Sequence, residues 1–384
     1  MIDLFVITGE PSGDAQGAKL VGELLKQRPS LKIGAVAGPK MRSHKIESFF
    51  PMENLQVMGF IDVFLALPKI LRQFFAIRNK ILELRPKAVL FIDYPGFNLR
   101  MQRSLRKKGF TGKLIQFVCP SVWAWGKKRI PMMAKHLDLL FTLFPFEAAC
   151  FKETKLPVKF VGHPLAASIA SFVPAYAFRK KYRFGEDEKI LAIFPGSRKK
   201  EIERNLPLQL LAAKRLLSLD PKIRIGISIA HTAFESEIRT LIGPFGGSAS
   251  VSLIPPEEAY DLMKAAWLAV ATSGTVTLEL ALHGTPTVVN FAIRPLDCFI
   301  AQKIFRINLP FYCIVNILLS KSVLPELFGP HFTSDKLFFW MAKMGFDNSF
   351  RNTCIKGLIE VRKSLEMNNT IKDSTEGLLS CMDF

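Results

Sequence analysis

The chain has 384 residues, of which 49% are hydrophobic and 22% are charged, a composition typical of a globular protein and short of that of a membrane-spanning one. The length predicts two domains, because a single hydrophobic core rarely serves so many residues. The formal net charge of +19 calls for an anionic partner, and the candidates are nucleic acid, phosphorylated small molecules and anionic lipid headgroups.

The start of the chain, its cysteines and its longest apolar stretches argue against three further classes. Residues 1–7 carry no basic leader and no small-residue cleavage site, so we expect a first strand there rather than a signal peptide. The six cysteines are scattered without a CxxC pair, which is typical of free thiols in a reducing cytosol. The apolar stretches 139–151 and 309–319 are shorter than the roughly 18 residues that a spanning helix needs, so no transmembrane helix is expected.

Short apolar runs alternate with helical patterns along the chain, which predicts the α/β class with parallel sheets. The strands expected in the first half are residues 4–8, 33–37, 88–92, 114–118, 139–143 and 158–161. Those expected in the second half are residues 190–194, 223–229, 251–253, 268–271 and 287–290. We place a boundary between the two series, which gives domains at 1–168 and 169–340. A helical tail at 341–384 is expected to contact the N-terminal domain or a partner subunit.

The loop after the first predicted strand reads Gly-Glu-Pro-Ser-Gly-Asp, residues 9–14. Ligands of parallel sheets bind beyond the carboxyl ends of the strands, so such loops are the places to look for chemistry. The glycines permit a tight turn, and Ser12 or Asp14 can cap the following helix. Neither role explains Glu10. The pattern is not GxGxxG, so a dinucleotide site is not expected.

Two later loops of the first half combine polar and aromatic residues. Asp93 ends an apolar strand, where partial desolvation can raise its pKa into the range of a general base. On the residues alone, an aspartate that bonds turn amides is an equally good interpretation. Trp123 and Trp125 follow the next strand, and such aromatics either fill a core or line a sugar or acyl-chain site.

The second half has two loops suited to phosphate. Pro-Gly-Ser-Arg, residues 195–198, offers backbone amides for an anion and the guanidinium of Arg198 for phosphate oxygens. Ser273, Gly274 and Thr275 open a helix whose N-terminal amides also favour phosphate. Glu279, one turn further along, can accept hydrogen bonds from two ribose hydroxyls, although a solvated helix residue is the alternative.

Residues 60–75 form an amphipathic candidate whose apolar groups are interleaved with basic ones. A buried crossover helix is the usual explanation of such a segment. The same mixture suits a helix resting in a membrane interface. In that case the membrane-contacting residues are Phe60, Ile61, Val63, Phe64, Leu67 and Leu71.

Taken together, these motifs resemble the lipid-A-disaccharide synthase family. The matching stretches are residues 9–14, 36–39, 57–59, 92–98, 120–125, 162–164, 195–198 and 273–275. They run in family order over most of the chain. The combination of Pro-Ser-Val-Trp-Ala-Trp at 120–125 with Gly-Ser-Arg at 196–198 is highly specific.

The resemblance implies a GT-B fold, in which two Rossmann-like domains with parallel sheets face a central cleft, and it implies a reaction. UDP-2,3-diacylglucosamine and 2,3-diacylglucosamine 1-phosphate would give the β-1,6-linked lipid A disaccharide 1-phosphate and UDP, with inversion. Asp93 matches the general base. The substrate- and UDP-binding residues that we carry over are Glu10, Ser12, Gly13, Arg198, Ser273, Gly274, Thr275, Glu279 and Asn316.

The same resemblance sets expectations about cofactors, partners and location. We expect no metal and no cofactor, because Arg198 and helix-end amides can stabilise the departing UDP and no DxD motif is present. We expect peripheral contact with the anionic cytoplasmic face of the inner membrane, no nucleic acid partner, and compatibility with a homodimer. The alternatives are another UDP-N-acetylglucosamine enzyme, such as the peptidoglycan lipid II synthase or an epimerase, and a basic nucleic-acid-binding protein. The chain departs from many relatives at Gly96, Cys119 and Ala167.

Overall fold

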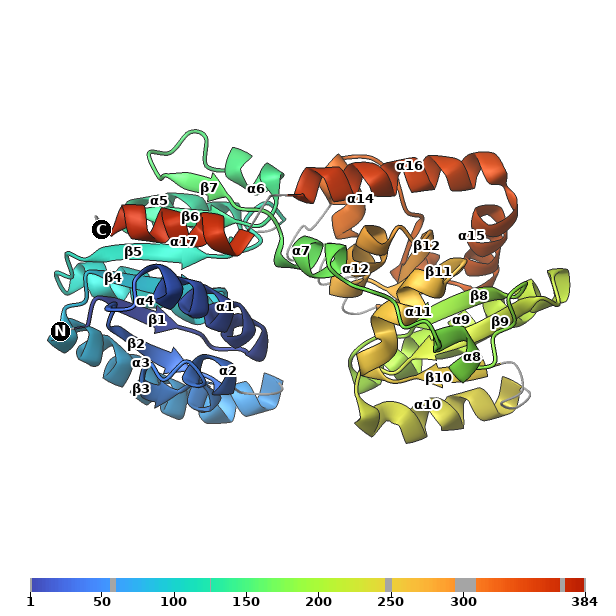
Figure 1. Cartoon of the computed structure of the whole chain (residues 1–384), viewed down its shortest axis with the longest axis horizontal. Helices are drawn as coiled ribbons and strands as arrows, with labels where there is room; N and C mark the ends of the chain where they lie inside the picture. The colour runs from blue at the N-terminus through green and yellow to red at the C-terminus, as the bar shows by residue number, and fades with distance from the viewer. Residues whose placement is uncertain are drawn as a thin grey trace. The chain divides into compact units, whose positions relative to one another are not determined.

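The computed structural model describes residues 2–55, 60–124, 126–245, 251–293, 309–366 and 370–382. The chain forms two compact units, one of residues 1–167 with 367–384 and the other of residues 168–366. Each unit is built on one parallel sheet with helices on its two faces (Figure 1). The predicted α/β class with two parallel sheets is therefore confirmed.

The first unit contains a seven-stranded sheet in the order β3-β2-β1-β4-β5-β6-β7. Its strands are β1 Leu4–Ile7, β2 Ile33–Ala37, β3 Glu47–Pro51, β4 Ala88–Ile92, β5 Lys113–Phe117, β6 Leu139–Thr142 and β7 Val158–Phe160. Its helices are α1 Pro11–Gln27, α2 Pro39–Arg42, α3 Phe60–Leu84, α4 Pro95–Lys107, α5 Ile130–His136, α6 Pro145–Ala149 and α17 Thr370–Cys381. Helix α7, Pro164–Ala170, spans the boundary between the units.

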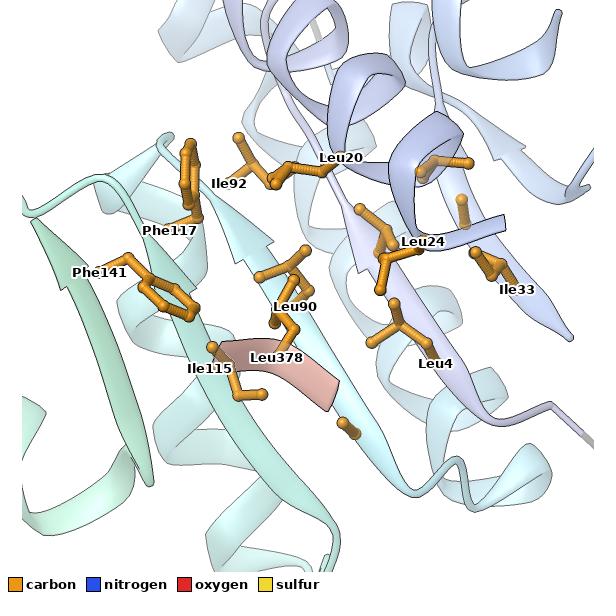
Figure 2. Packing of buried hydrophobic residues seen from close by; sticks show 14 of the residues in the cluster. Leu4, Leu20, Leu24, Ile33, Leu90, Ile92, Ile115, Phe117, Phe141 and Leu378 are labelled. Atoms are coloured by element: carbon orange, nitrogen blue, oxygen red, sulfur yellow. The ribbon is translucent and has the colours of Figure 1, made fainter. Parts of the chain in front are cut away.

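Both faces of the central part of this sheet are buried, because successive residues of its central strands alternate between two apolar clusters. In β1, Leu4 and Val6 belong to the cluster under α1 and α17, whereas Phe5 and Ile7 belong to the cluster on the other face. Figure 2 shows the first cluster, in which Leu378 of α17 lies among strand residues from far earlier in the chain. This alternation explains why the strands read as continuous apolar runs in the sequence.

The second unit contains a six-stranded sheet in the order β10-β9-β8-β11-β12-β13. Its strands are β8 Lys189–Phe194, β9 Ile223–Ser228, β10 Val251–Ile254, β11 Leu268–Thr272, β12 Thr287–Phe291 and β13 Glu326–Phe328. Its helices are α8 Phe178–Lys181, α9 Lys199–Leu219, α10 Glu235–Ile242, α11 Ala259–Ala265, α12 Thr275–His283, α14 Ile314–Leu319, α15 Ser334–Phe346 and α16 Asn348–Leu365. In the described residues no helix is long and apolar enough to cross a membrane.

The eleven strands expected from the sequence are all present, with ends within one residue of the expected ones. Strands β3 and β13 were not expected, and both lie at sheet edges. The tail that we expected as one segment at 341–384 is divided instead. Helix α16 buries Leu358 and Val361 in the second unit, while α17 buries Leu378 in the first. The division follows from the apolar faces of these two helices: α16 packs against α12, α14 and α15 of the second unit, whereas α17 packs on the core of the first sheet.

Candidate functional site

Two carboxylates lie at the carboxyl edge of the first sheet. Glu10 follows β1 and Asp93 follows β4, and these strands are neighbours in the sheet with Ile7 paired to Phe91. Burial raises the pKa of Glu10, and the negative charge of Asp93 raises it further. Burial also raises the pKa of Asp93, although the amide of Tyr94 partly offsets this. The structure therefore brings together two residues that the sequence had assigned to separate loops.

The turn that carries Asp93 is held by its backbone. Asp93 and Tyr94 both have positive φ, at 49° and 46°, a conformation that side-chain-bearing residues adopt at a cost. The amide of Asp93 donates to the carbonyl oxygen of Phe117 at 2.9 Å, and its carbonyl oxygen accepts from Nδ2 of Asn98 at 2.7 Å. These two bonds, one from the same turn and one from the neighbouring strand, fix the backbone that carries the Asp93 carboxylate.

Gly9 allows the ring of Tyr94 to lie against the first loop. A Cβ atom at Gly9 would stand 2.3 Å from Cδ1 of Tyr94, which is closer than any real contact. The ring stacks on Phe97 with 5.7 Å between centroids, and its hydroxyl donates to the carbonyl oxygen of Leu55 at 3.0 Å. Tyr94 was not among the expected site residues, although its place beside Asp93 was visible in the sequence.

The remaining residues of the first loop have different roles from those expected. Helix α1 begins after Glu10 with no side-chain cap, so neither Ser12 nor Asp14 caps it. The buried carboxylate of Asp14 instead accepts from the amides of Gly38 and Lys40 at 2.9 and 2.8 Å, which ties α1 to the N-terminal end of α2. Ser12 is exposed and Gly13 is buried at the start of the helix. Both lie close in sequence to Glu10.

A pocket of about 350 Å³ lies at the carboxyl edge of the second sheet. Its lining includes Pro195, Gly196 and Ser197 after β8, Ser228, Ile229 and Ala230 at the end of β9, and Thr272, Ser273, Gly274, Thr275 and Glu279 from the end of β11 into α12. The two loops expected to bind phosphate, which are far apart in the sequence, are thus on one cavity. The N-terminal end of α12 is also at this cavity, so its amides favour an anion there.

The loop after β8 is shaped by Glu201. Gly196 has a φ of +129°, and a Cβ atom there would stand 2.6 Å from Cβ of Glu201. Oε2 of Glu201 accepts from the amide of Ser197 at 3.0 Å, and Oε1 accepts from Nη1 of Arg198 at 2.6 Å. The Arg198 side chain is 79% exposed and does not line the pocket, although the residues before it do.

A network of buried amide side chains supports the loop after β8. Nδ2 of Asn205 donates to the carbonyl oxygen of Glu201 at 2.8 Å, and Oδ1 accepts from Nδ2 of Asn290 at 3.1 Å. The hydroxyl of Thr272 donates to the carbonyl oxygen of Pro195 at 2.8 Å. These bonds join the ends of β8, β11 and β12, and sequence reasoning gave no sign of them.

Glu279 lies on the pocket with a partner of its own. Burial raises the pKa of the Glu279 carboxyl, and a hydrogen bond from Tyr260 acts in the opposite direction. The hydroxyl of Tyr260 donates to Oε1 of Glu279 at 3.1 Å. The alternative of a solvated helix residue therefore does not hold for Glu279.

Asn316 is a structural residue here. Its buried side chain donates to the carbonyl oxygen of Leu324 and to Oε1 of Glu326, both at 2.7 Å. Its Oδ1 accepts from the amides of Val323 and Leu324 at 2.8 and 2.9 Å. All four hydrogen-bonding positions of the amide are used within the protein. A role of Asn316 in substrate binding stays a prediction, and its amide holds the chain from Val323 to Glu326 in place.

The amphipathic segment forms the first half of α3, with Pro68 inside the helix. The side chains of Phe60, Ile61, Val63, Phe64 and Leu67 lie outside the described residues. Leu71 and Phe75 are 46% and 48% exposed, whereas Phe74 packs against Phe97 with 5.3 Å between ring centroids. Part of the helix is thus in the core and part presents large apolar groups to solvent.

The tryptophan loop is anchored at Trp123. Its ring meets Phe146 edge-on at 5.5 Å, and its side chain hydrogen-bonds the buried carboxylate of Glu147. Trp125 lies outside the described residues. Trp123 therefore has a packing role, and the question of a sugar or acyl-chain contact stays a prediction. Among the described residues no group of three or more His, Cys, Asp and Glu side chains is placed to hold a metal ion.

Two parallel-sheet units, with a pocket beyond the strand ends of the second, define a GT-B type protein. Solved structures agree on the fold. The UDP-N-acetylglucosamine 2-epimerase of Neisseria meningitidis bound to UDP-GlcNAc matches with a TM-score of 0.63 at 12% identity, over 99% of this chain and 100% of that one. A glycosyltransferase from Rickettsia africae matches with a TM-score of 0.60 at 12% identity, over 99% of this chain and 98% of that one. At such identities the likeness shows the fold alone.

The family is defined by closer matches. The model of the lipid-A-disaccharide synthetase family matches residues 4–347. The lipid-A-disaccharide synthase of Chlamydia trachomatis is 37% identical over 325 residues, which is 85% of this chain and 53% of that protein. The one of Rhodospirillum centenum is 33% identical over 367 residues, 94% of this chain and 90% of that protein. The chain belongs to the lipid-A-disaccharide synthase family, and it spans about half the length of the chlamydial relatives it matches.

Proposed function

We propose that this chain is an inverting glycosyltransferase of lipid A biosynthesis. It condenses UDP-2,3-diacylglucosamine with 2,3-diacylglucosamine 1-phosphate and releases UDP. The observation that carries the proposal is the pocket of the second unit, where the Gly196 loop, the N-terminus of α12 and Glu279 meet. Family membership supports the sugar and lipid classes of the substrates.

The donor diphosphate fits the phosphate-favouring part of this pocket. The backbone amides around Gly196 and at the start of α12 can receive the diphosphate oxygens, and the exposed guanidinium of Arg198 can swing from Glu201 to the same oxygens. Glu279 can accept from the ribose hydroxyls. These donors stabilise the charge that develops on the leaving UDP, so the step does not depend on a metal.

Asp93 acts as the general base that deprotonates the acceptor. Its carboxylate takes the proton of the 6-hydroxyl while that oxygen attacks the anomeric carbon, and the bond from the anomeric carbon to UDP breaks with its electron pair leaving on the phosphate. Partial burial suits this role because it raises the pKa of Asp93. The Glu10 carboxylate beside it adds negative charge at this edge of the first sheet.

The test is to incubate the purified chain with both diacylated substrates and to measure UDP release and disaccharide mass. Turnover that requires both substrates is expected, with UDP-N-acetylglucosamine alone as the control. Asp93→Asn should abolish turnover and leave UDP affinity unchanged, since the aspartate does not line the donor pocket. Absence of turnover at every acyl length tried would refute the proposed reaction, and near-normal rates in the variant would remove Asp93 as the base.

A further inference from the structure

A cluster of three rings, outside the lining of the second-unit pocket, lies beside Glu279. Tyr260 lies at the second position of α11, and its ring is 5.1 Å from that of His283 and 5.6 Å from that of Phe172. The rings of Phe172 and His283 are 5.5 Å apart at 90°. Edge-on contacts of this kind fix ring orientation more tightly than apolar burial alone. The Tyr260 ring is therefore held by contacts with both Phe172 and His283.

The same tyrosine reaches one oxygen of Glu279. Glu279 and His283 are four residues apart on α12, so they share a face of the helix, and Tyr260 contacts both. Its hydroxyl donates to Oε1 of Glu279 at 3.1 Å. Within the described ranges no other hydrogen bond to this carboxylate is found. Oε2 is thus left for a ligand.

Helix α11 also supplies residues that line the pocket. Ala259 and Met263, one turn apart, line the cavity, whereas Tyr260 between them does not. The tyrosine is set back from the cavity and is joined to its lining through the hydrogen bond to Glu279. A burial-lowered pKa of about 4 keeps the His283 ring uncharged near neutral pH, so no positive charge competes with the hydroxyl for the carboxylate.

We propose that Tyr260 is a positioning residue that holds Glu279 for the ribose of the donor nucleotide, and so makes the enzyme prefer ribonucleotide to deoxyribonucleotide donors. The proposal rests on the proposed function, in which Glu279 accepts from the ribose hydroxyls. It adds that the selectivity for those hydroxyls depends on a residue outside the pocket. Without Tyr260 the carboxylate can rotate, and a hydroxyl pair then meets it in more than one orientation.

The experiment compares UDP with 2′,3′-dideoxy-UDP by titration calorimetry. Tyr260→Phe should weaken UDP binding roughly tenfold, because a hydrogen bond to a charged group is lost, and should change dideoxy-UDP binding by less than about twofold. Tyr182→Phe is the matched control. It removes the hydroxyl of another half-buried tyrosine of the same unit, which interacts with Lys181 and Glu258 and does not line the pocket, and it should leave both affinities unchanged.

A double variant separates positioning from general damage. If Tyr260 acts through Glu279, then Tyr260→Phe added to Glu279→Gln should cost UDP binding nothing further. Equal loss for both nucleotides, additive loss in the double variant, or an unchanged single variant would each overturn the proposal. Failure of the unaltered chain to bind UDP at all is a separate result, because it refutes the proposed function itself and removes the basis of the inference.

Discussion

At the scale of single residues, the turn at Asp93 combines backbone strain with tight packing. Asp93 and Tyr94 both adopt the left-handed conformation, at a cost of about 1–3 kcal/mol each. Gly9 must stay without a side chain for the Tyr94 ring to fit. Strain of this kind persists only where surrounding bonds impose it, and here those bonds aim a partly buried carboxylate at the edge of the sheet.

The close approach of Gly9 to Tyr94 gives a stability prediction. Gly9→Ala should lower the free energy of unfolding by about 1–3 kcal/mol, because the new methyl group overlaps the ring and one of the two must move. Urea denaturation of the variant and the unaltered chain measures this change in the free energy of unfolding. Gly96→Ala is the control, since nothing lies within 4 Å of a Cβ atom there, and it should change stability little. Equal stability of the two variants would contradict the close approach.

The raised pKa of Asp93 gives a prediction about pH. The base must be ionised to act, so kcat/KM should fall as pH drops through the folded-state pKa of Asp93, which burial places above that of an ordinary aspartate. The acid limb of the profile should therefore lie at higher pH than the ordinary pKa of about 3.9 would give. An acid limb at or below that ordinary value would show that Asp93 is not the titrating base.

The residues of the two sites were predictable to different degrees. Short motifs locate Asp93, Ser273 and Glu279 because each follows a strand, and strand ends meet at one edge of a parallel sheet. No short motif locates Tyr260, because its partner Glu279 is 19 residues away on another helix. For Asn316 the sequence predicts a ligand contact from its family position alone and does not reveal the internal hydrogen bonds that its side chain makes.

At the scale of elements, the strands were predictable because each central strand is an apolar run buried on both faces. β3 was missed because it is an edge strand with a largely exposed or half-buried pattern, so its sequence shows no apolar run. β13 has three residues and the same edge position. The helices of the tail were expected, but local sequence does not state which sheet an amphipathic face will cover.

Helix α17 gives the prediction at this scale. Leu378→Ala should destabilise the first unit by about 2–5 kcal/mol, because its fully buried side chain packs in the first cluster and its removal leaves a cavity. Hydrogen exchange should show faster opening of β1 and β4 and unchanged protection in the second unit. Ser380→Ala, at an exposed position of the same helix, is the control. Unchanged exchange in β1 would mean that α17 adds nothing to this core.

At the scale of the whole molecule, the charge of +19 and the apolar surface of α3 act in the same direction. Each basic residue near an anionic bilayer contributes about 1 kcal/mol of attraction, and exposed side chains such as Leu71 and Phe75 add apolar insertion. We propose on this basis a peripheral association with an anionic membrane. The homodimer that the family resemblance allows stays a prediction, which light scattering of the purified chain can test.

Vesicle sedimentation tests the association. Leu71→Ser with Phe75→Ser should weaken binding to vesicles containing anionic lipid, because both substitutions remove apolar side chains that are about half exposed. Phe339→Ser, which removes an exposed ring on α15 of the second unit, is the matched control. Raising the salt concentration should weaken the binding of all forms. Equal binding by the variant and the unaltered chain would leave charge as the sole attraction.

The return of α17 to the first sheet has a consequence for how the protein is made on the ribosome. Domains of a growing chain usually fold in the order of synthesis, beginning with the N-terminal one. Here the first unit lacks Leu378 and its neighbours until after the second unit has been translated. Its apolar face under α1 must therefore wait, partly uncovered, while about half of the chain is still being added. The unit that begins first is the one that can finish folding last.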